Sequence, residues 1–320
     1  MATGLSGRPR GRPAAPRARR HRGGTSWLAR NRLWVVVAPA AVMVLVVVTA
    51  LVVRDRGDGG DGAGSAGSSS EPVVGDDLHS VVVDPSRPER VFLGGHEAVA
   101  TSSDGGRTWS RVPTLQGADA MGWAFTEDAV WVSGHPGLSR STDGGRTFVR
   151  ADEGLPDTDV HALGSGPGVL YAASPGVGLF ATTDGGRSWQ VRSADVGHTF
   201  AGRIVVDPDR PEHLMAADVS SGVMESADGG RRWRRLEALP AASWLSRTGP
   251  GMADLVASGP HGAVRTADGG RSWQPLQLPE GASVVEASSS RPGLFYAAGH
   301  DGDRAQLWVS HDGARTWGRP

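Results

Sequence analysis

The chain has 320 residues, a formal net charge of −1 and no cysteine. Disulfides and a thiol nucleophile are therefore excluded, and a folded domain of this sequence must be stabilised by burial alone. The charge is unevenly distributed, because a basic N-terminal segment is offset by acidic residues further on, and the use of arginine without any lysine suggests a GC-rich bacterial genome.

The N-terminal segment has the pattern of a membrane anchor. Residues 1–32 contain nine arginines and no acidic residue, and residues 33–53 are 21 positions without a charge. At 1.5 Å per residue such a helix spans the roughly 30 Å hydrocarbon layer. Because arginine accumulates on the cytoplasmic side, we expect residues 1–32 to form a basic cytoplasmic tail and residues 33–53 a single transmembrane helix.

Two other interpretations of this segment are less favoured. A cleaved signal peptide usually has an apolar region of only about 7 to 15 residues, and no small-x-small cleavage site follows Val53. A basic arm could bind nucleic acid, but a tail directly before a membrane span is better explained by contact with anionic lipid. The expected partner of this segment is therefore the membrane and not nucleic acid.

Residues 54–75 are dominated by Gly, Ser and Asp. Such a composition cannot bury enough apolar surface to fold, so we expect a flexible linker. The remaining residues, 76–320, are then held on the extracytoplasmic side of the cell membrane by a single-pass anchor.

Residues 76–320 contain one octapeptide six times: Ser/Thr, any residue, Asp, Gly, Gly or Ala, Arg, usually Thr/Ser, and an aromatic residue. The copies are Ser102–Trp109, Ser141–Phe148, Thr182–Trp189, Ser226–Trp233, Thr266–Trp273 and Ser310–Trp317. Their aspartates are 39 to 44 residues apart, which is the period of a four-stranded propeller blade. We therefore predict an all-β fold, a six-bladed β-propeller of four-stranded antiparallel blades.

The octapeptide is typical of a tight hairpin. Its carboxylate can accept hydrogen bonds from turn N–H groups, its glycines supply positive φ, and its aromatic ring can wedge between neighbouring sheets. The carboxylates assigned this structural role are Asp104, Asp143, Asp184, Asp228, Asp268 and Asp312. Two copies depart from the pattern, with Arg232 in place of Thr/Ser and Ala314 in place of the second Gly, so those turns are expected to be looser.

This octapeptide resembles the Asp-box (BNR) repeat, a family shared by sialidases, sortilin-like receptors, photosystem II stability factor-like propellers and bacterial membrane-anchored propellers of the glycosyl hydrolase type. The resemblance implies that the boxes are structural hairpins and not catalytic groups. Sialidase chemistry is not expected, because the only tyrosines, Tyr171 and Tyr296, lie within apolar segments where their rings pack most simply in the core.

The sixth repeat ends shortly after Trp317, which leaves its outermost strand short. Propellers commonly close by borrowing a strand from the other end of the chain. We therefore expect residues 72–75 to pair with the last blade.

A second repeated pattern lies where the innermost strands are expected to begin, on the rim opposite the octapeptides. Asp77, Asp119 and Asp159 each precede a potential metal ligand by two residues: His79, Met121 and His161. His96 and His135 end the second strands of the first two blades, on the same rim. The predicted ligand-binding residues are thus His79, His96, Met121, His135 and His161, converging near the central channel.

Imidazole and thioether donors together favour copper or zinc over magnesium or calcium. The three aspartates are then expected to orient the imidazoles. The alternative is a polar channel in which these side chains bond to one another and to water. Trp123 lies outside the octapeptides and either stacks on a sugar or peptide or belongs to the core.

The function expected from this arrangement is that of a binding or assembly factor, with a protein, peptide or glycan ligand at the histidine-rich rim. One alternative is a glycoside hydrolase with a non-sialidase active site. Its candidate carboxylates are Asp77, Asp119 and Asp159, with Glu97 and Asp218. A purely structural interaction ring without a small ligand is the other alternative.

Overall fold

The computed structural model of the protein describes residues 71–320. The predicted basic tail (1–32), the transmembrane helix (33–53) and most of the linker (54–70) lie outside the described residues. Residues 71–320 contain 23 strands and one short 3₁₀ helix, Pro113–Leu115. Within this part of the chain no helix has the length and apolar character needed to cross a membrane. The prediction of an all-β domain is confirmed.

The strands form successive antiparallel meanders. The first contains β1 (Leu78–Asp84), β2 (Arg87–Gly95), β3 (Val99–Ser102) and β4 (Ser110–Arg111). The second contains β5 (Asp119–Phe125), β6 (Val130–His135), β7 (Ser139–Ser141) and β8 (Val149–Arg150). The third contains β9 (Ala162–Gly166), β10 (Val169–Ser174), β11 (Gly178–Thr182) and β12 (Gln190–Ser193).

The remaining meanders continue in the same order. The fourth contains β13 (Phe200–Val206), β14 (Leu214–Asp218), β15 (Gly222–Ser226) and β16 (Arg234–Leu236). The fifth contains β17 (Trp244–Arg247), β18 (Leu255–Gly259), β19 (Gly262–Thr266) and β20 (Gln274–Leu276). The last has three strands, β21 (Val284–Ala287), β22 (Phe295–Asp301) and β23 (Arg304–Ser310).

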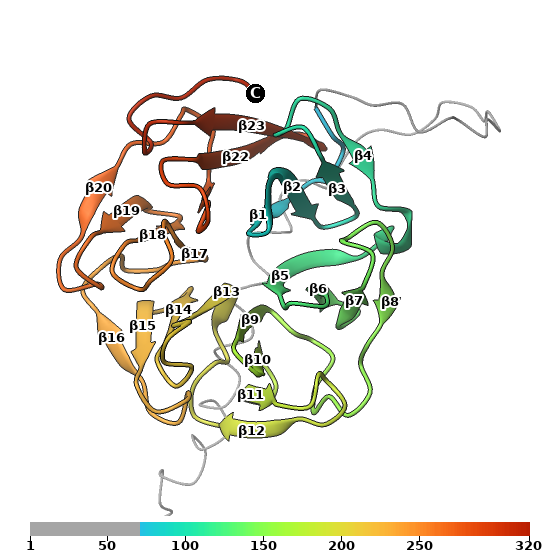
Figure 1. Cartoon of the computed structure of the whole chain (residues 1–320), viewed down its shortest axis with the longest axis vertical. Coiled ribbons are helices and arrows are strands. Elements are labelled where there is room, and N and C mark those ends of the chain that lie inside the picture. The colour runs from blue at the N-terminus through green and yellow to red at the C-terminus, as the bar shows by residue number, and fades with distance from the viewer. Residues whose placement is uncertain (1–70) are drawn as a thin grey trace, which may run out of the picture. The chain divides into compact units, whose positions relative to one another are not determined.

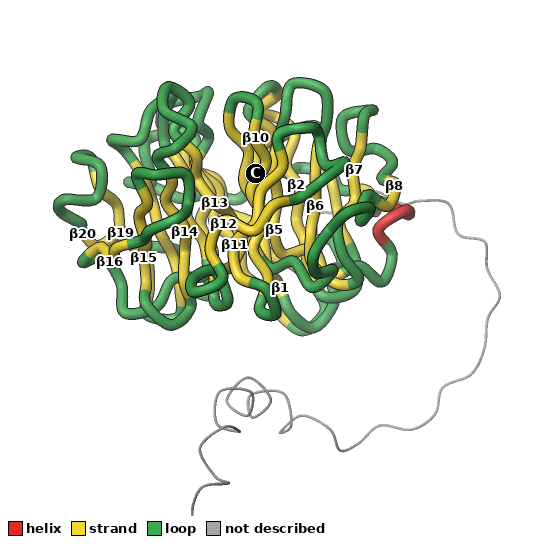
Figure 2. Tube along the Cα trace, turned by 90° about the horizontal axis from the view of Figure 1, so that it is seen from below, coloured by secondary structure: helices red, strands yellow, loops and turns green. Residues whose placement is uncertain are grey.

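The meanders are arranged around a ring, with β1, β5, β9, β13 and β17 nearest its centre (Figure 1). The strands run across the thickness of the ring, and loops occupy both edges (Figure 2). Two innermost strands, β9 and β13, also pair with each other in parallel, which joins the third and fourth meanders into one sheet. Because each sheet packs between two neighbours, inner strands such as β1 are buried on both faces and are apolar over consecutive residues.

The outer edge of β23 is shared by both ends of the described chain. Val73 forms an antiparallel bridge with Arg304, and the Ala305 N–H donates to the Pro72 carbonyl at 2.9 Å. Gly318 bridges to Val309 further along the same strand. The expected pairing of residues 72–75 with the last sheet is therefore present.

Each octapeptide begins at the residue that ends the third strand of its meander. In the first copy, Asp104 Oδ1 accepts the N–H groups of Arg107 and Thr108 at 3.0 and 2.9 Å, and Oδ2 accepts the Thr108 hydroxyl at 2.6 Å. The indole N–H of Trp109 donates to the Gly106 carbonyl at 2.9 Å, and the ring is buried between sheets. One carboxylate thus accepts the hydrogen bonds of the turn, and the turn holds the aromatic ring between the sheets.

The two irregular copies differ from this arrangement in different ways. Asp228 Oδ1 still accepts the N–H groups of Arg231 and Arg232, but Arg232 supplies no hydroxyl for the second carboxylate oxygen. The sixth copy keeps the hydrogen bonds to its carboxylate, but the indole N–H of Trp317 donates to the Gln277 carbonyl, and Ala314 has φ +65°, in the left-handed region. The fourth turn therefore lacks a hydrogen bond, and the sixth contains backbone strain.

Replacing Ala314 by glycine is expected to stabilise the domain by about 1 kcal/mol, because a Cβ in the left-handed region is strained by roughly that amount. The reverse change at the equivalent position, Gly230→Ala, should destabilise it, since Gly230 has φ +84° and a Cβ there would lie 2.3 Å from Leu179 Cδ2. Urea unfolding of both variants measures the two effects. An unchanged midpoint for A314G would contradict the assignment of strain to this turn.

The octapeptide carboxylates also predict a dependence of stability on pH. Burial raises the pKa of Asp104, but hydrogen bonds from Thr108, Ser102 and Arg107 outweigh it and lower the pKa to about 2. The contribution of Asp104 is therefore present above its unfolded pKa of about 4 and is lost as the pH falls toward 2. Asp104→Asn should destabilise by roughly 1 kcal/mol at pH 7. Urea unfolding at pH 7 and pH 2.5 should show a smaller difference from the parent at the lower pH.

Candidate metal centre

The edge of the ring opposite the octapeptides is formed where the innermost strands begin. There the register of β1 against β2 shifts at His79, and the register of β5 against β6 shifts at Met121. Each shift is a β-bulge, which turns a side chain out of the regular alternation of the strand. The two bulges therefore give His79 and Met121 an orientation that a regular strand would not.

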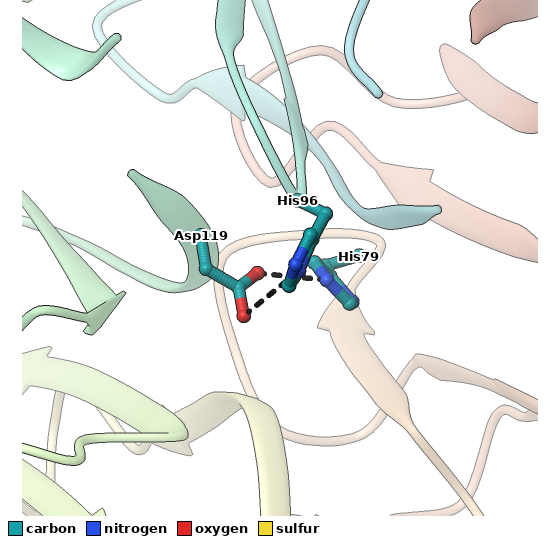
Figure 3. A group of neighbouring side chains, drawn as sticks. All are labelled: His79, His96 and Asp119. Carbon is teal, nitrogen blue, oxygen red and sulfur yellow. Dashed lines mark ion pairs between the residues drawn. The ribbon is translucent and has the colours of Figure 1, made fainter. Parts of the chain in front are cut away.

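Three side chains from three elements form the first trio: His79, His96 and Asp119 (Figure 3). His79 lies in β1, His96 directly follows β2, and Asp119 begins β5 of the next meander. His79 Nε2 is 2.7 Å from Asp119 Oδ1, and His96 Nδ1 is 3.5 Å from Asp119 Oδ2. The ligand atoms of the trio all lie within 4.8 Å of one another. Two imidazoles and a carboxylate thus face a common space between two sheets.

Two atoms of this trio are buried without a hydrogen bond. The side chain of Asp119 is 7% exposed and that of His79 is 19% exposed. Nevertheless, among the described residues neither Asp119 Oδ1 nor His79 Nε2 has a hydrogen-bond partner, although the two atoms are within hydrogen-bond distance. Buried polar atoms normally have hydrogen-bond partners, and a cation bound between these two atoms would satisfy both. Donors about 2.1 Å from an ion at tetrahedral angles lie about 3.4 Å apart. The 3.5 Å separation of His96 Nδ1 and Asp119 Oδ2 is close to this value, whereas the 2.7 Å separation of His79 Nε2 and Asp119 Oδ1 is shorter, so an ion would move these two atoms apart.

The same arrangement recurs one meander further on, in the second trio: His135, Asp159 and His161. His135 Nε2 and His161 Nε2 lie 2.9 and 2.7 Å from Asp159 Oδ1. Here too the buried atoms Asp159 Oδ1 and His161 Nε2 have no hydrogen bond within the described part. Each trio combines one largely buried histidine with one that is more than half exposed, so each is accessible from solvent.

The two trios are connected through one strand pair. Asp119 of the first trio lies directly opposite His135 of the second in the ladder between β5 and β6. The adjoining residue, Gly134, has φ +152°, and a Cβ there would lie 1.6 Å from the Asp119 carbonyl oxygen. Only glycine permits this close approach.

The first trio favours positive charge. Burial lowers the pKa of His79, but the close approach of Asp119, with the charges of Asp77 and Asp76, outweighs it, so the pKa is raised above its usual value. A bound cation would occupy the position that a proton on His79 otherwise takes.

The predicted site residues come together, but not at a single point. The four histidines divide into two trios, and Asp119 and Asp159 are members of the trios and not groups that orient them from outside. Asp77 is 59% exposed, and its Oδ2 lies 3.8 Å from His79 Nδ1, beyond hydrogen-bond distance. Met121 is half-buried on β5, two residues beyond Asp119.

Trp123 has the environment of a core residue. It is fully buried, its indole N–H donates to Ser80 Oγ at 2.9 Å, and its ring packs on Phe92 with centroids 5.0 Å apart. The ring therefore has no exposed face on which a sugar or peptide could stack.

A buried polar network near the centre of the ring was not anticipated. Glu286 in β21 is 1% exposed, forms an ion pair with Arg203 in β13, and accepts the indole N–H of Trp244 at 2.9 Å. The sequence signal was an acidic and a basic residue within otherwise apolar inner strands. Nothing in the sequence indicated that residues so far apart would meet.

No protein-family model matches the chain, and no curated protein matches it. Its fold is similar to that of several solved structures. They include the GH74 xyloglucanase from Xanthomonas campestris, with a TM-score of 0.52 and 18% identity over 79% of this chain. A GH74 enzyme from Niastella koreensis has a TM-score of 0.51 and 18% identity over 74% of this chain. A protein of unknown function from Bacteroides thetaiotaomicron has a TM-score of 0.55 and 9% identity over 75% of each chain.

These likenesses support a β-propeller fold. The matched regions cover 46% and 37% of the two GH74 enzymes, so this chain spans less than half of either. At these identities the comparison concerns the fold alone, and the site must be interpreted from its own geometry.

Proposed function

We propose that this protein is a membrane-anchored binding factor, a six-bladed Asp-box propeller that holds a transition-metal ion in each of its two trios. The blade count is supported by six meanders in which each third strand ends at the start of an octapeptide. The anchor is supported by the uncharged residues 33–53 after nine arginines, which would place the propeller on the extracytoplasmic side.

The observation that carries the metal proposal is that each trio brings two imidazoles and a carboxylate together, with a buried nitrogen and a buried carboxylate oxygen in ion-pair contact but without an aligned hydrogen bond. An ion coordinated by His79, His96 and Asp119 would satisfy the buried nitrogen and carboxylate oxygen together. Two imidazoles and a carboxylate suit zinc or copper(II). Met121, two residues beyond Asp119 on β5, is the candidate thioether ligand, and it would add a preference for copper(I). Three protein ligands leave one position open at a tetrahedral ion.

The open position suggests how the protein acts as a binding factor. The exposed histidines, His96 and His135, lie at the rim, so a donor group of a protein, peptide or glycan can approach from solvent. A metal-held ligand would then be presented at one edge of a rigid ring tethered to the membrane.

Metal analysis of the full chain tests this proposal. The chain is extracted with detergent from membranes that have been washed with carbonate. Because the wash removes proteins that are not anchored, this step also tests the membrane anchor. The extracted chain is then loaded with zinc or copper, and excess ion is removed. We expect up to two ions per chain, one in H79A, which retains the second trio, and none in the double variant H79A/H161A. Met121→Leu should weaken copper(I) binding and leave zinc binding unchanged.

His261→Ala is the matched control, because His261 is exposed and belongs to neither trio. If H79A unfolds, H96A replaces it, since His96 is more than half exposed and is less able to disturb the core. A parent chain that retains no ion, or a double variant that retains as much as the parent, would refute the metal sites.

A glycoside hydrolase is the second candidate, and the GH74-like fold is the observation in its favour. Against it, Asp119 and Asp159 each contact imidazoles and not an open carboxylate pair. We expect no turnover of xyloglucan or other β-glucans by the full chain. Hydrolysis that is lost in Asp119→Asn but kept in Asp77→Asn would favour the hydrolase over the binding factor.

A further inference from the structure

A small cavity of about 100 Å³ lies near the ring axis, away from the trios. Every meander contributes a residue from the end of its innermost strand or just beyond it: Pro85, Phe125, Ser165, Val206, Arg247 and Ser289. The innermost strands run in the same direction, and β1, β5 and β9 begin at the trios. In an antiparallel meander the first and third strands end at the same edge, so these strand ends lie on the octapeptide side. The cavity therefore occupies the opposite end of the axis from the proposed metal sites.

The cavity is positively charged. Arg203 and Arg247 line it, and no carboxylate does. Arg203 forms an ion pair with Glu286, whose other oxygen is occupied by Trp244. Arg247 donates only to the Pro250 carbonyl, and within residues 71–320 it has no ion pair. Among the described residues, one positive charge is thus left without a carboxylate partner in the cavity lining.

The two guanidinium groups are close enough to repel each other. Burial lowers the pKa of Arg247, and the charge of Arg203 lowers it further, against weaker attraction from Asp207 and Glu286. Two like charges held together in a small cavity are typical of a site that an anion completes.

The size and chemistry of the cavity limit the anion. A volume of about 100 Å³ has room for about three water molecules. A guanidinium presents parallel N–H donors that match the two oxygens of a carboxylate, and a single negative charge balances the excess. Ser289 lies in the same lining and can supply a hydroxyl, whereas the Ser165 hydroxyl already donates to the Phe125 carbonyl.

We propose that this axial cavity binds a small monocarboxylate through Arg247 and Arg203. The site does not depend on the trios, because no residue is shared between them. It would give the ring a second ligand, held on the octapeptide side.

Binding of acetate to the full chain in a non-ionic detergent tests the proposal. Saturation-transfer NMR of the acetate methyl group, titrated at constant ionic strength, measures the affinity. We expect saturable binding by the parent and an affinity at least roughly tenfold weaker in Arg247→Gln, because a hydrogen-bonded charge pair is lost. Phosphate at the same ionic strength should compete poorly.

Arg235→Gln is the matched control, because Arg235 is exposed on β16 and lies outside the cavity. H79A should also bind acetate like the parent, so failure of the metal proposal and failure of this one are distinguishable. Circular dichroism and urea unfolding check that each variant is folded. If R247Q is unfolded, Ser289→Leu replaces it and should exclude acetate by filling the cavity.

Three results would overturn the proposal. They are no saturable acetate binding by the parent, equal binding by the parent and by a folded R247Q or S289L, and stronger competition by phosphate than by acetate itself.

Discussion

All the innermost strands run in the same direction across the ring, and the placement of every polar group discussed above depends on this constraint. Because a four-stranded antiparallel meander returns the chain to the starting edge of the next innermost strand, residues at equal positions in successive meanders become neighbours around the axis. Strand beginnings collect at one edge and strand ends at the other. The trios form at the first edge, and the arginine-lined cavity forms near the second.

The centre of the ring contains charged side chains that the surrounding strands shield from solvent. Glu286 is almost fully buried, and isolated burial of a carboxylate would be strongly unfavourable. Its contacts with Arg203 and Trp244 compensate for that loss of hydration. The same contact with Arg203 places a second guanidinium in the cavity that Arg247 also lines. The trios carry a similar desolvation cost, because each buries atoms of a carboxylate and an imidazole that form no aligned hydrogen bond with each other. In both places a small ion would remove the imbalance.

The sequence predicted the architecture well because its signal is local and repeated. The octapeptide specifies a turn by its own hydrogen bonds, and its regular recurrence predicted the repeated antiparallel meanders. The trios were only partly predictable. Strand order placed the histidines on one edge of the ring. Their division into two groups depends on which sheets are neighbours and on β-bulges, and no residue type in the sequence predicts such a bulge. The Arg203–Glu286 contact joins different meanders and left no pattern beyond two charges in apolar strands.

The pairing at β23 affects how the molecule can assemble. The bridge between Val73 and Arg304 joins residues about 230 positions apart in the chain, so it can form only after Arg304 has been synthesised. Contacts so distant in sequence carry a large loop-closure entropy and slow the final step of folding. Until that step the outer edge of β23 is also unpaired, and an unpaired edge invites pairing with other chains. During synthesis the nascent domain is therefore exposed to misassembly until its last strand emerges.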